Sequence, residues 1–347
     1  MALCQVKVGI VAPLTGPFAP WGKMIVDGAK LAETAINAGI STSGEKLELI
    51  IRDDQSNPAR ALEASKQLAV LDKVSALVGC PSSVAALASA PVASDNNLLM
   101  ISFATGSSVT EKSRNILRLM GREDRLIRTV ADHIAVKFLG KRVGAWLAPE
   151  LAFARGLIES RGVKIENSAT IESAEPELPA WIGQLDVVVA SPIAARAIRQ
   201  APPGKPTFLM PSTLLDASLA PLLPLPNFIA ITNPGADFFE AGPTIARRAG
   251  YEQPEFSGYV IYSYAAVELV SALSRKAGND KSDGRRLVDL AQKEEPIRTV
   301  LGNLRFDENR ELRGWRFAMY GAASAPDVCK TPECKNYDTC PSDCPVK

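Results

Sequence analysis

Short, almost wholly apolar segments that alternate with helical patterns constrain this chain most. Residues 6–13 read VKVGIVAP, and residues 22–38 then place apolar side chains at helical spacing. Further apolar segments occupy residues 74–78 and 98–102, each next to a helical pattern. A strand that lacks alternating polar residues is typical of a parallel sheet covered by helices on both faces. The sequence therefore predicts an α/β fold.

The pattern starts again near Arg122, with a helix expected over residues 124–139 and a strand over residues 142–147. A chain of 347 residues is long enough for two domains of ordinary size. We therefore expect two α/β units. Later segments, including a helical piece over residues 296–301 and a closing hairpin over residues 304–320, would complete either unit.

Charge and hydropathy exclude several classes of protein. The 39 basic and 38 acidic residues nearly cancel, which argues against a nucleic-acid-binding surface. No apolar run approaches the roughly 20 residues of a membrane span. Residues 1–4 lead directly into the first expected strand, so we expect no signal peptide in this sequence. A cytosolic chain and a mature secreted chain both remain open on this evidence.

Four of the six cysteines lie in the last nineteen residues, CKTPECKNYDTCPSDCPVK. Their spacing does not match the paired C-x2-C pattern of common zinc sites, and prolines lie between them. We expect a tail held by disulfides, with a metal site as the weaker alternative, and this favours an oxidising compartment. The four residues are Cys329, Cys334, Cys340 and Cys344.

The loops that follow the expected strands carry rings and hydroxyl groups. Ligands of open parallel sheets bind outside the carboxyl ends of the strands. A serine at a helix N-terminus suits a carboxylate oxygen, although it can equally serve only as the helix N-cap. The candidates on these loops are Phe18, Trp21, Ser82, Ser83, Phe103, Ala104 and Thr105.

Signals for an enzyme are weak. The sequence has no dinucleotide-binding glycine fingerprint, no phosphate-binding Walker loop and no G-x-S-x-G turn. His133 is the only histidine and falls within an expected helix. Asp53 and Asp54 more often cap a loop than bind a metal, and Cys80 lacks a basic neighbour in sequence. We expect no catalytic residue, no cofactor and no metal.

Several segments resemble the type I periplasmic solute-binding proteins of ABC transporters, in the leucine/isoleucine/valine-binding group. The opening VKVGIVAPLTGPFAPWGKMIVDGAKLAETAINA is similar to that family's first strand and helix. ELIIRDDQSNPARALEASKQLAV, VSALVGCPSSVAALASAPVASDNNLLMISFATG and YVIYSYAAVELVSAL resemble later units. The resemblance implies two lobes joined by three crossings, each lobe a parallel sheet flanked by helices. It implies an N-terminal lobe of residues 1–119 and 238–308, a C-terminal lobe of residues 120–237 and 309–325, and a tail of residues 326–347.

The resemblance also implies roles for individual residues. Ser83, Ala104 and Thr105 fall where the family holds the ligand's carboxylate, and Trp21 and Phe153 fall where it often has tyrosine. Ser212 falls where the amino-acid binders place the acid that pairs with the ligand's ammonium, and Ser191 lies near a missing tyrosine. Asp216 lies one turn further on and is the alternative partner for an ammonium.

The function implied is a periplasmic substrate-binding protein that captures a small solute by lobe closure and delivers it to an ABC permease. We expect a monomer without a nucleic-acid partner. The expected ligand is a small or aromatic carboxylate, or a neutral polar compound, rather than a zwitterionic amino acid. The alternatives are an amino-acid transport protein and a ligand sensor that acts through a partner protein.

Overall fold

The computed structural model describes residues 5–39, 46–201, 204, 206–293 and 295–321. They form two compact units. Among the described residues, the first unit comprises those up to Gly121 and Gly235–Trp315, and the second comprises Arg122–Pro234 and residues 316–321. The lobe boundaries implied by the resemblance remain a prediction. Within the described ranges, no helix has both the length and the apolar character that crossing a bilayer would require.

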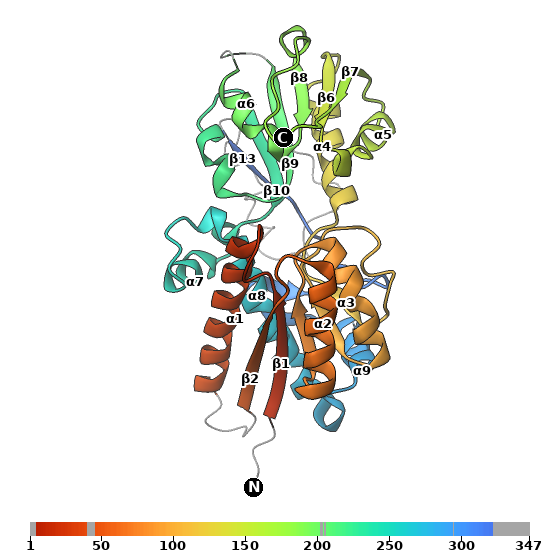
Figure 1. The fold of residues 1–347 in the computed structure, drawn as a ribbon, viewed down its shortest axis with the longest axis vertical. Coiled ribbons are helices and arrows are strands. Elements are labelled where there is room, and N and C mark those ends of the chain that lie inside the picture. Colours follow the sequence, from red (N-terminus) through yellow and green to blue (C-terminus); the bar gives the residue numbers. More distant parts are fainter. Residues whose placement is uncertain (1–4, 40–45, 202–203, 205, 294, 322–347) are drawn as a thin grey trace. The chain divides into compact units, whose positions relative to one another are not determined.

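The first unit is built on a parallel sheet with the strand order β2-β1-β3-β4-β5. Its strands are β1 (Gln5–Ala12), β2 (Lys46–Asp53), β3 (Ala76–Gly79), β4 (Leu99–Ser102) and β5 (Ile116–Arg118). Its helices are α1 (Ala19–Gly39), α2 (Pro58–Lys66), α3 (Ser83–Asp95), α7 (Gly242–Arg248), α8 (Gly258–Ala277) and α9 (Gly284–Ala291). Figure 1 shows α1, α2 and α3 flanking the strands of this unit.

Apolar side chains on both faces of the sheet explain why helices cover it. Every residue of β3 and β4 is buried, as expected for strands covered on both sides. Val11, Leu77 and Met100 from three strands share one core cluster with Leu68 and Ala86 from the helical layer. Helix α8 is buried along most of its length, which makes it a central helix of the unit rather than a surface one.

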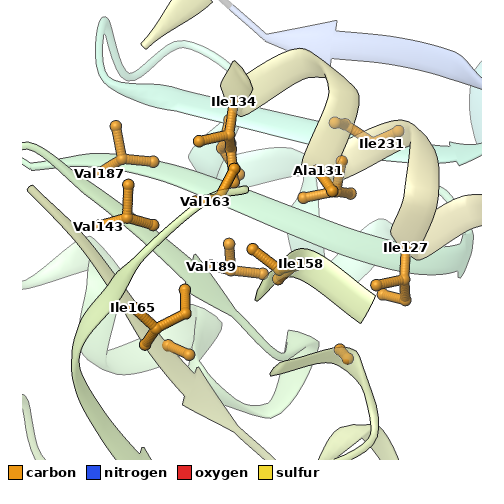
Figure 2. Packing of buried hydrophobic residues seen from close by; sticks show 14 of the residues in the cluster. Ile127, Ala131, Ile134, Val143, Ile158, Val163, Ile165, Val187, Val189 and Ile231 are labelled. Atoms are coloured by element: carbon orange, nitrogen blue, oxygen red, sulfur yellow. The ribbon is translucent and has the colours of Figure 1, made fainter. Parts of the chain in front are cut away.

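The second unit has a six-stranded sheet in the order β13-β10-β9-β8-β6-β7, in which only β13 is antiparallel to its neighbour. Its strands are β6 (Val143–Leu147), β7 (Ile165–Thr170), β8 (Val187–Ala190), β9 (Thr207–Leu214), β10 (Phe228–Asn233) and β13 (Ala318–Gly321). Its helices are α4 (Glu123–Lys137), α5 (Ala154–Glu159) and α6 (Ala195–Arg199). Figure 2 shows Ile134 and Ala131 of α4 in the same apolar cluster as Val187 and Val189 of β8.

Two expectations for the late segments are wrong. Residues 297–299 form strand β11 (Ile297–Thr299) instead of a helical piece, and β11 pairs with β12 (Gly302–Leu304). The expected closing hairpin is replaced by a single bridge between Phe306 and Leu312, while β13 pairs with β10. The predicted α/β class, with a parallel sheet flanked by helices in each unit, is confirmed.

Candidate ligand-binding site

The loop after β1 is held in shape by the loop after β2. The Asp53 carboxylate accepts hydrogen bonds from the Leu14 and Thr15 N–H groups at 2.8 and 3.2 Å, and from the Thr15 hydroxyl at 2.7 Å. The Ser56 hydroxyl donates to the Thr15 carbonyl at 2.9 Å and accepts from the Phe18 N–H at 3.1 Å. Asp53 therefore serves this loop, in line with its interpretation as a loop-capping residue.

The braced loop presents two stacked rings. Phe18 and Trp21 lie with ring centroids 4.7 Å apart and planes 12° from parallel, and both remain partly exposed. Trp21 also lies 5.6 Å from the ring of Tyr259, which is 6.2 Å from the ring of Phe103. Phe103 and Tyr259 are fully buried, so of these four rings Phe18 and Trp21 are the two that offer surface to a solute. Sequence analysis missed Tyr259, whose sole signal was its place at the start of a helix.

Ser83 joins the loop after β3 to the loop after β4. Its hydroxyl oxygen accepts a hydrogen bond from the Gly106 N–H at 3.0 Å, and the Ala104 N–H donates to the Ser102 hydroxyl at 3.2 Å. Ser82 occupies the N-cap position of α3, but its hydroxyl makes no capping hydrogen bond. The alternative that Ser82 is an ordinary N-cap side chain is therefore not realised in this structure.

These two loops retain donors that an anion could use. Across the part of the chain that the structure describes, neither the backbone N–H nor the hydroxyl of Thr105 has a hydrogen-bond partner. The Ser83 hydroxyl accepts one hydrogen bond and still has its own hydrogen to donate. Ser83 is the first residue of α3, where the helix dipole favours negative charge. Thr105 precedes Gly106, whose N–H is hydrogen-bonded to the Ser83 hydroxyl. The arrangement can hold a carboxylate oxygen.

In the second unit, the polar side chains proposed for ligand contact are bonded locally. The Ser191 hydroxyl accepts from the Ala148 N–H at 2.8 Å and is buried. The Ser212 hydroxyl donates to the Leu214 carbonyl at 2.8 Å. Asp216 caps the short helix Ala217–Leu222 by accepting the Ser218 N–H at 2.7 Å. Ser191 therefore supports the loop after β6. The position at which the resemblance places an acidic partner for an ammonium is occupied by Ser212, which carries no charge.

Large apolar side chains are exposed on the loops where the strands end. In the second unit, Phe153 is 39% exposed after β6 and Ile193 is 42% exposed after β8. In the first unit, Leu14 and Val84 are exposed after β1 and β3. Exposed apolar surface at the carboxyl ends of parallel strands is typical of ligand contact. Ile193 was missed because an isolated apolar residue in a loop gives no signal in sequence.

Comparison with known proteins shows what the chain is similar to. A family model described as periplasmic binding protein matches residues 5–167. The chain is 28% identical over 344 residues to the Leu/Ile/Val-binding protein homolog 1 of Brucella suis, covering 92% of this chain and 91% of that protein. These findings support a type I periplasmic binding protein of the branched-chain amino acid family, in agreement with the resemblance seen in the sequence.

Solved structures agree on the fold. A leucine binding protein, LivK from Thermotoga maritima, matches with a TM-score of 0.74 at 18% identity, covering 90% of this chain and 94% of that one. An ABC-transporter solute binding protein from Rhodopseudomonas palustris, in complex with 3,4-dihydroxybenzoic acid, matches with a TM-score of 0.73 at 23% identity, covering 91% and 92%. The proteins of this family are substrate-binding proteins of ABC transporters, and their function is transport.

Two buried acidic groups near the loops of this binding protein, Asp54 and the Cys80 thiol, have pKa values above their ordinary ones. Burial, together with the charge of Asp53, raises the pKa of Asp54 to about 6, against the opposing hydrogen bond from the Ser56 N–H. Burial raises the pKa of the Cys80 thiol to about 12, although its hydrogen bond to Ser89 opposes the change. A thiol that stays protonated is not a nucleophile, so the structural interpretation of Cys80 is the one its surroundings support. The tail cysteines and Cys4 lie outside the described residues.

Proposed function

We propose that this substrate-binding protein captures a small organic carboxylate with an apolar, preferably aromatic, body and delivers it to an ABC permease. The observation that carries the proposal is in the first unit. Among the described residues, the donors of Thr105 have no acceptor and the Ser83 hydroxyl keeps its hydrogen. Thr105 lies two residues after Phe103, a ring of the Trp21–Tyr259–Phe103 group. A periplasmic location, a monomeric state and closure of two lobes on the solute stay predictions.

The carboxylate part of this proposal suits either class of ligand found among similar proteins. The Brucella relative is named for leucine, isoleucine and valine, and the Rhodopseudomonas structure contains a dihydroxybenzoic acid. Each of these ligands has a carboxylate. The ammonium group is what distinguishes an amino acid, so the counter-charge for an ammonium decides between the two classes.

The second unit argues against an ammonium. Ser212 stands where the resemblance places the acidic partner, and its hydroxyl is bonded to the Leu214 carbonyl. Asp216 is exposed and caps its own short helix. Burial of an ammonium without a counter-charge costs several kcal/mol. The exposed apolar side chains of Phe153 and Ile193 suit a ring or an alkyl body instead.

An amino-acid transport protein is the second candidate, favoured by the names of the Brucella relatives. A sensor of the same fold that acts through a partner protein is the third. Transport is favoured over sensing by the family, whose members serve ABC transporters.

Calorimetric titration with matched pairs separates the ligand classes. Leucine is compared with 4-methylpentanoate, and phenylalanine with 3-phenylpropanoate, so that only the amino group differs. Benzoate against benzamide tests the carboxylate itself. We expect the acids to bind at least ~10-fold more tightly than their amino or amide partners, which corresponds to about 1.4 kcal/mol. Tighter binding of leucine than of its deaminated analogue would refute the proposal and direct mutagenesis to Asp216.

A further inference from the structure

Arg118, the last residue of β5, is a fully buried charged side chain in the first unit. Its Nε donates to the Glu311 carboxylate at 2.8 Å, and both side chains are almost completely removed from solvent. The Thr110 hydroxyl donates to the other Glu311 oxygen at 2.8 Å. Because apolar replacement of a buried ion pair is often neutral or stabilising, stability alone is a weak account of this pair.

The other side of the guanidinium contacts the candidate anion-binding loop. One terminal nitrogen donates to the Ala104 carbonyl, and the other donates to the Gly106 carbonyl at 2.8 Å. In a trans peptide the C=O and the N–H point in opposite directions. The carbonyl of residue 104 and the N–H of Thr105 belong to one peptide, so binding of that carbonyl by Arg118 turns the Thr105 N–H away from the arginine. This N–H has no partner among the described residues.

We infer that Arg118 is a positioning residue for the loop of residues 104–106, and that Glu311 holds its guanidinium in place. The planar fork of arginine binds two carbonyls at once, while Nε remains for the carboxylate. The loop is thus fixed from one side by Arg118 and from the other by Ser83 and Ser102. The part of the inference that concerns the ligand rests on the proposed function; the part that concerns the loop does not.

Two variants test the inference. Arg118→Met combined with Glu311→Gln removes both charges, so that no unpaired buried charge is left. Arg118→Lys keeps the charge but loses the fork, and it serves if the double variant does not fold. The control is Arg60→Met with Glu63→Gln, which removes an ion pair of the same 2.8 Å length from the surface of α2 in the same unit.

Hydrogen exchange of the ligand-free protein is the first measurement. We expect the Ala104 and Gly106 amides to exchange at least ~10-fold faster in both Arg118 variants, beyond any change in β1, because their hydrogen bonds depend on the fixed loop. The control should match the wild type. Unchanged exchange of these amides overturns the inference, whatever the ligand is.

Affinity for benzoate and for benzamide is the second measurement. We expect benzoate binding to weaken at least ~10-fold in the double variant, with a smaller loss for benzamide and an intermediate loss for Arg118→Lys. Faster exchange with unchanged benzoate affinity overturns the part of the inference that concerns the ligand. Absence of acid binding by the wild type would refute the proposed function alone, since the exchange result still decides whether Arg118 fixes the loop.

Discussion

The contribution of Asp54 to the stability of the first unit should fall as pH rises from 4 to 7. Its side chain is buried at the end of β2, where its carboxylate accepts the Ser56 N–H at 2.8 Å. Burial raises its pKa from 3.8 to about 6. Between these two values the folded state keeps the proton that the unfolded state has lost. Unfolding then releases a proton, so a higher pH favours unfolding.

The size of the effect follows from the two pKa values. A pKa difference of about 2 corresponds to about 3 kcal/mol of unfolding free energy. The contribution is fully present below pH 3.8 and is lost as pH passes 6. Asp54→Asn has no proton to lose, and its side-chain oxygen can still accept the Ser56 N–H. At pH 7 this variant should therefore be the more stable protein.

Urea unfolding of the wild type and Asp54→Asn at pH 4, 5, 6 and 7 provides the assay. The unfolding free energy of the wild type minus that of the variant should fall by roughly 2.4 kcal/mol over this range, because the unfolded state has already lost part of the proton at pH 4. The titration of other carboxylates cancels in the difference. Parallel curves for the two proteins would refute the reasoning.

Asp53→Asn is the matched control for this experiment. Burial acts to raise the pKa of Asp53, but hydrogen bonds from the Thr15 hydroxyl and from three backbone N–H groups outweigh it and lower the pKa. Its stabilisation is present at neutral pH and is lost on acidification, so its difference curve should slope the opposite way.

Three further predictions concern the loops and the tail. Trp21→Ala should weaken acid binding at least ~10-fold and lower the unfolding free energy by only about 1–2 kcal/mol, since the ring is partly exposed; equal losses of binding and stability, by calorimetry and urea unfolding, would contradict this. Ser83→Ala removes the acceptor of the Gly106 N–H and a free donor, so it should weaken acid binding ~10-fold at a stability cost of about 1 kcal/mol; unchanged titrations would argue against it. The four tail cysteines should form two disulfides, and thiol counting under denaturing, non-reducing conditions should then find only Cys4 and Cys80; stoichiometric zinc would favour the metal alternative.

The sequence predicts the elements of this fold best where both faces of a strand are buried. Residues 6–13 were expected as a strand, and β1 spans Gln5–Ala12. Short strands that are not buried along their whole length were harder. Both β11 and β13 carry too few residues to show a period, and the pairing of β13 with β10 joins segments far apart in the chain. Partners of that kind are decided by tertiary packing, which a local pattern does not contain.

The positions of the site were more predictable than the side chains that support it. Trp21, Ser83 and Thr105 follow the ends of strands, and the carboxyl ends of parallel strands share one edge of a sheet. Tyr259 and Arg118 reach the same loops from elements more than ten residues away in sequence. Nothing in their local sequence shows that contact, because a buried tyrosine or arginine is recognised only by its neighbours.

Three serines after strands show why the sequence alone could not predict which hydroxyl is available to a ligand. Ser83, Ser191 and Ser212 give the same signal in sequence, a small hydroxyl at or after a strand end. In the structure, the Ser191 oxygen is occupied by the Ala148 N–H, and the Ser212 hydrogen is directed to the Leu214 carbonyl. Ser83 accepts one bond and keeps its hydrogen free at a helix N-terminus. A hydroxyl takes whichever partner lies within about 3 Å, so the local backbone decides which serine remains available to a ligand.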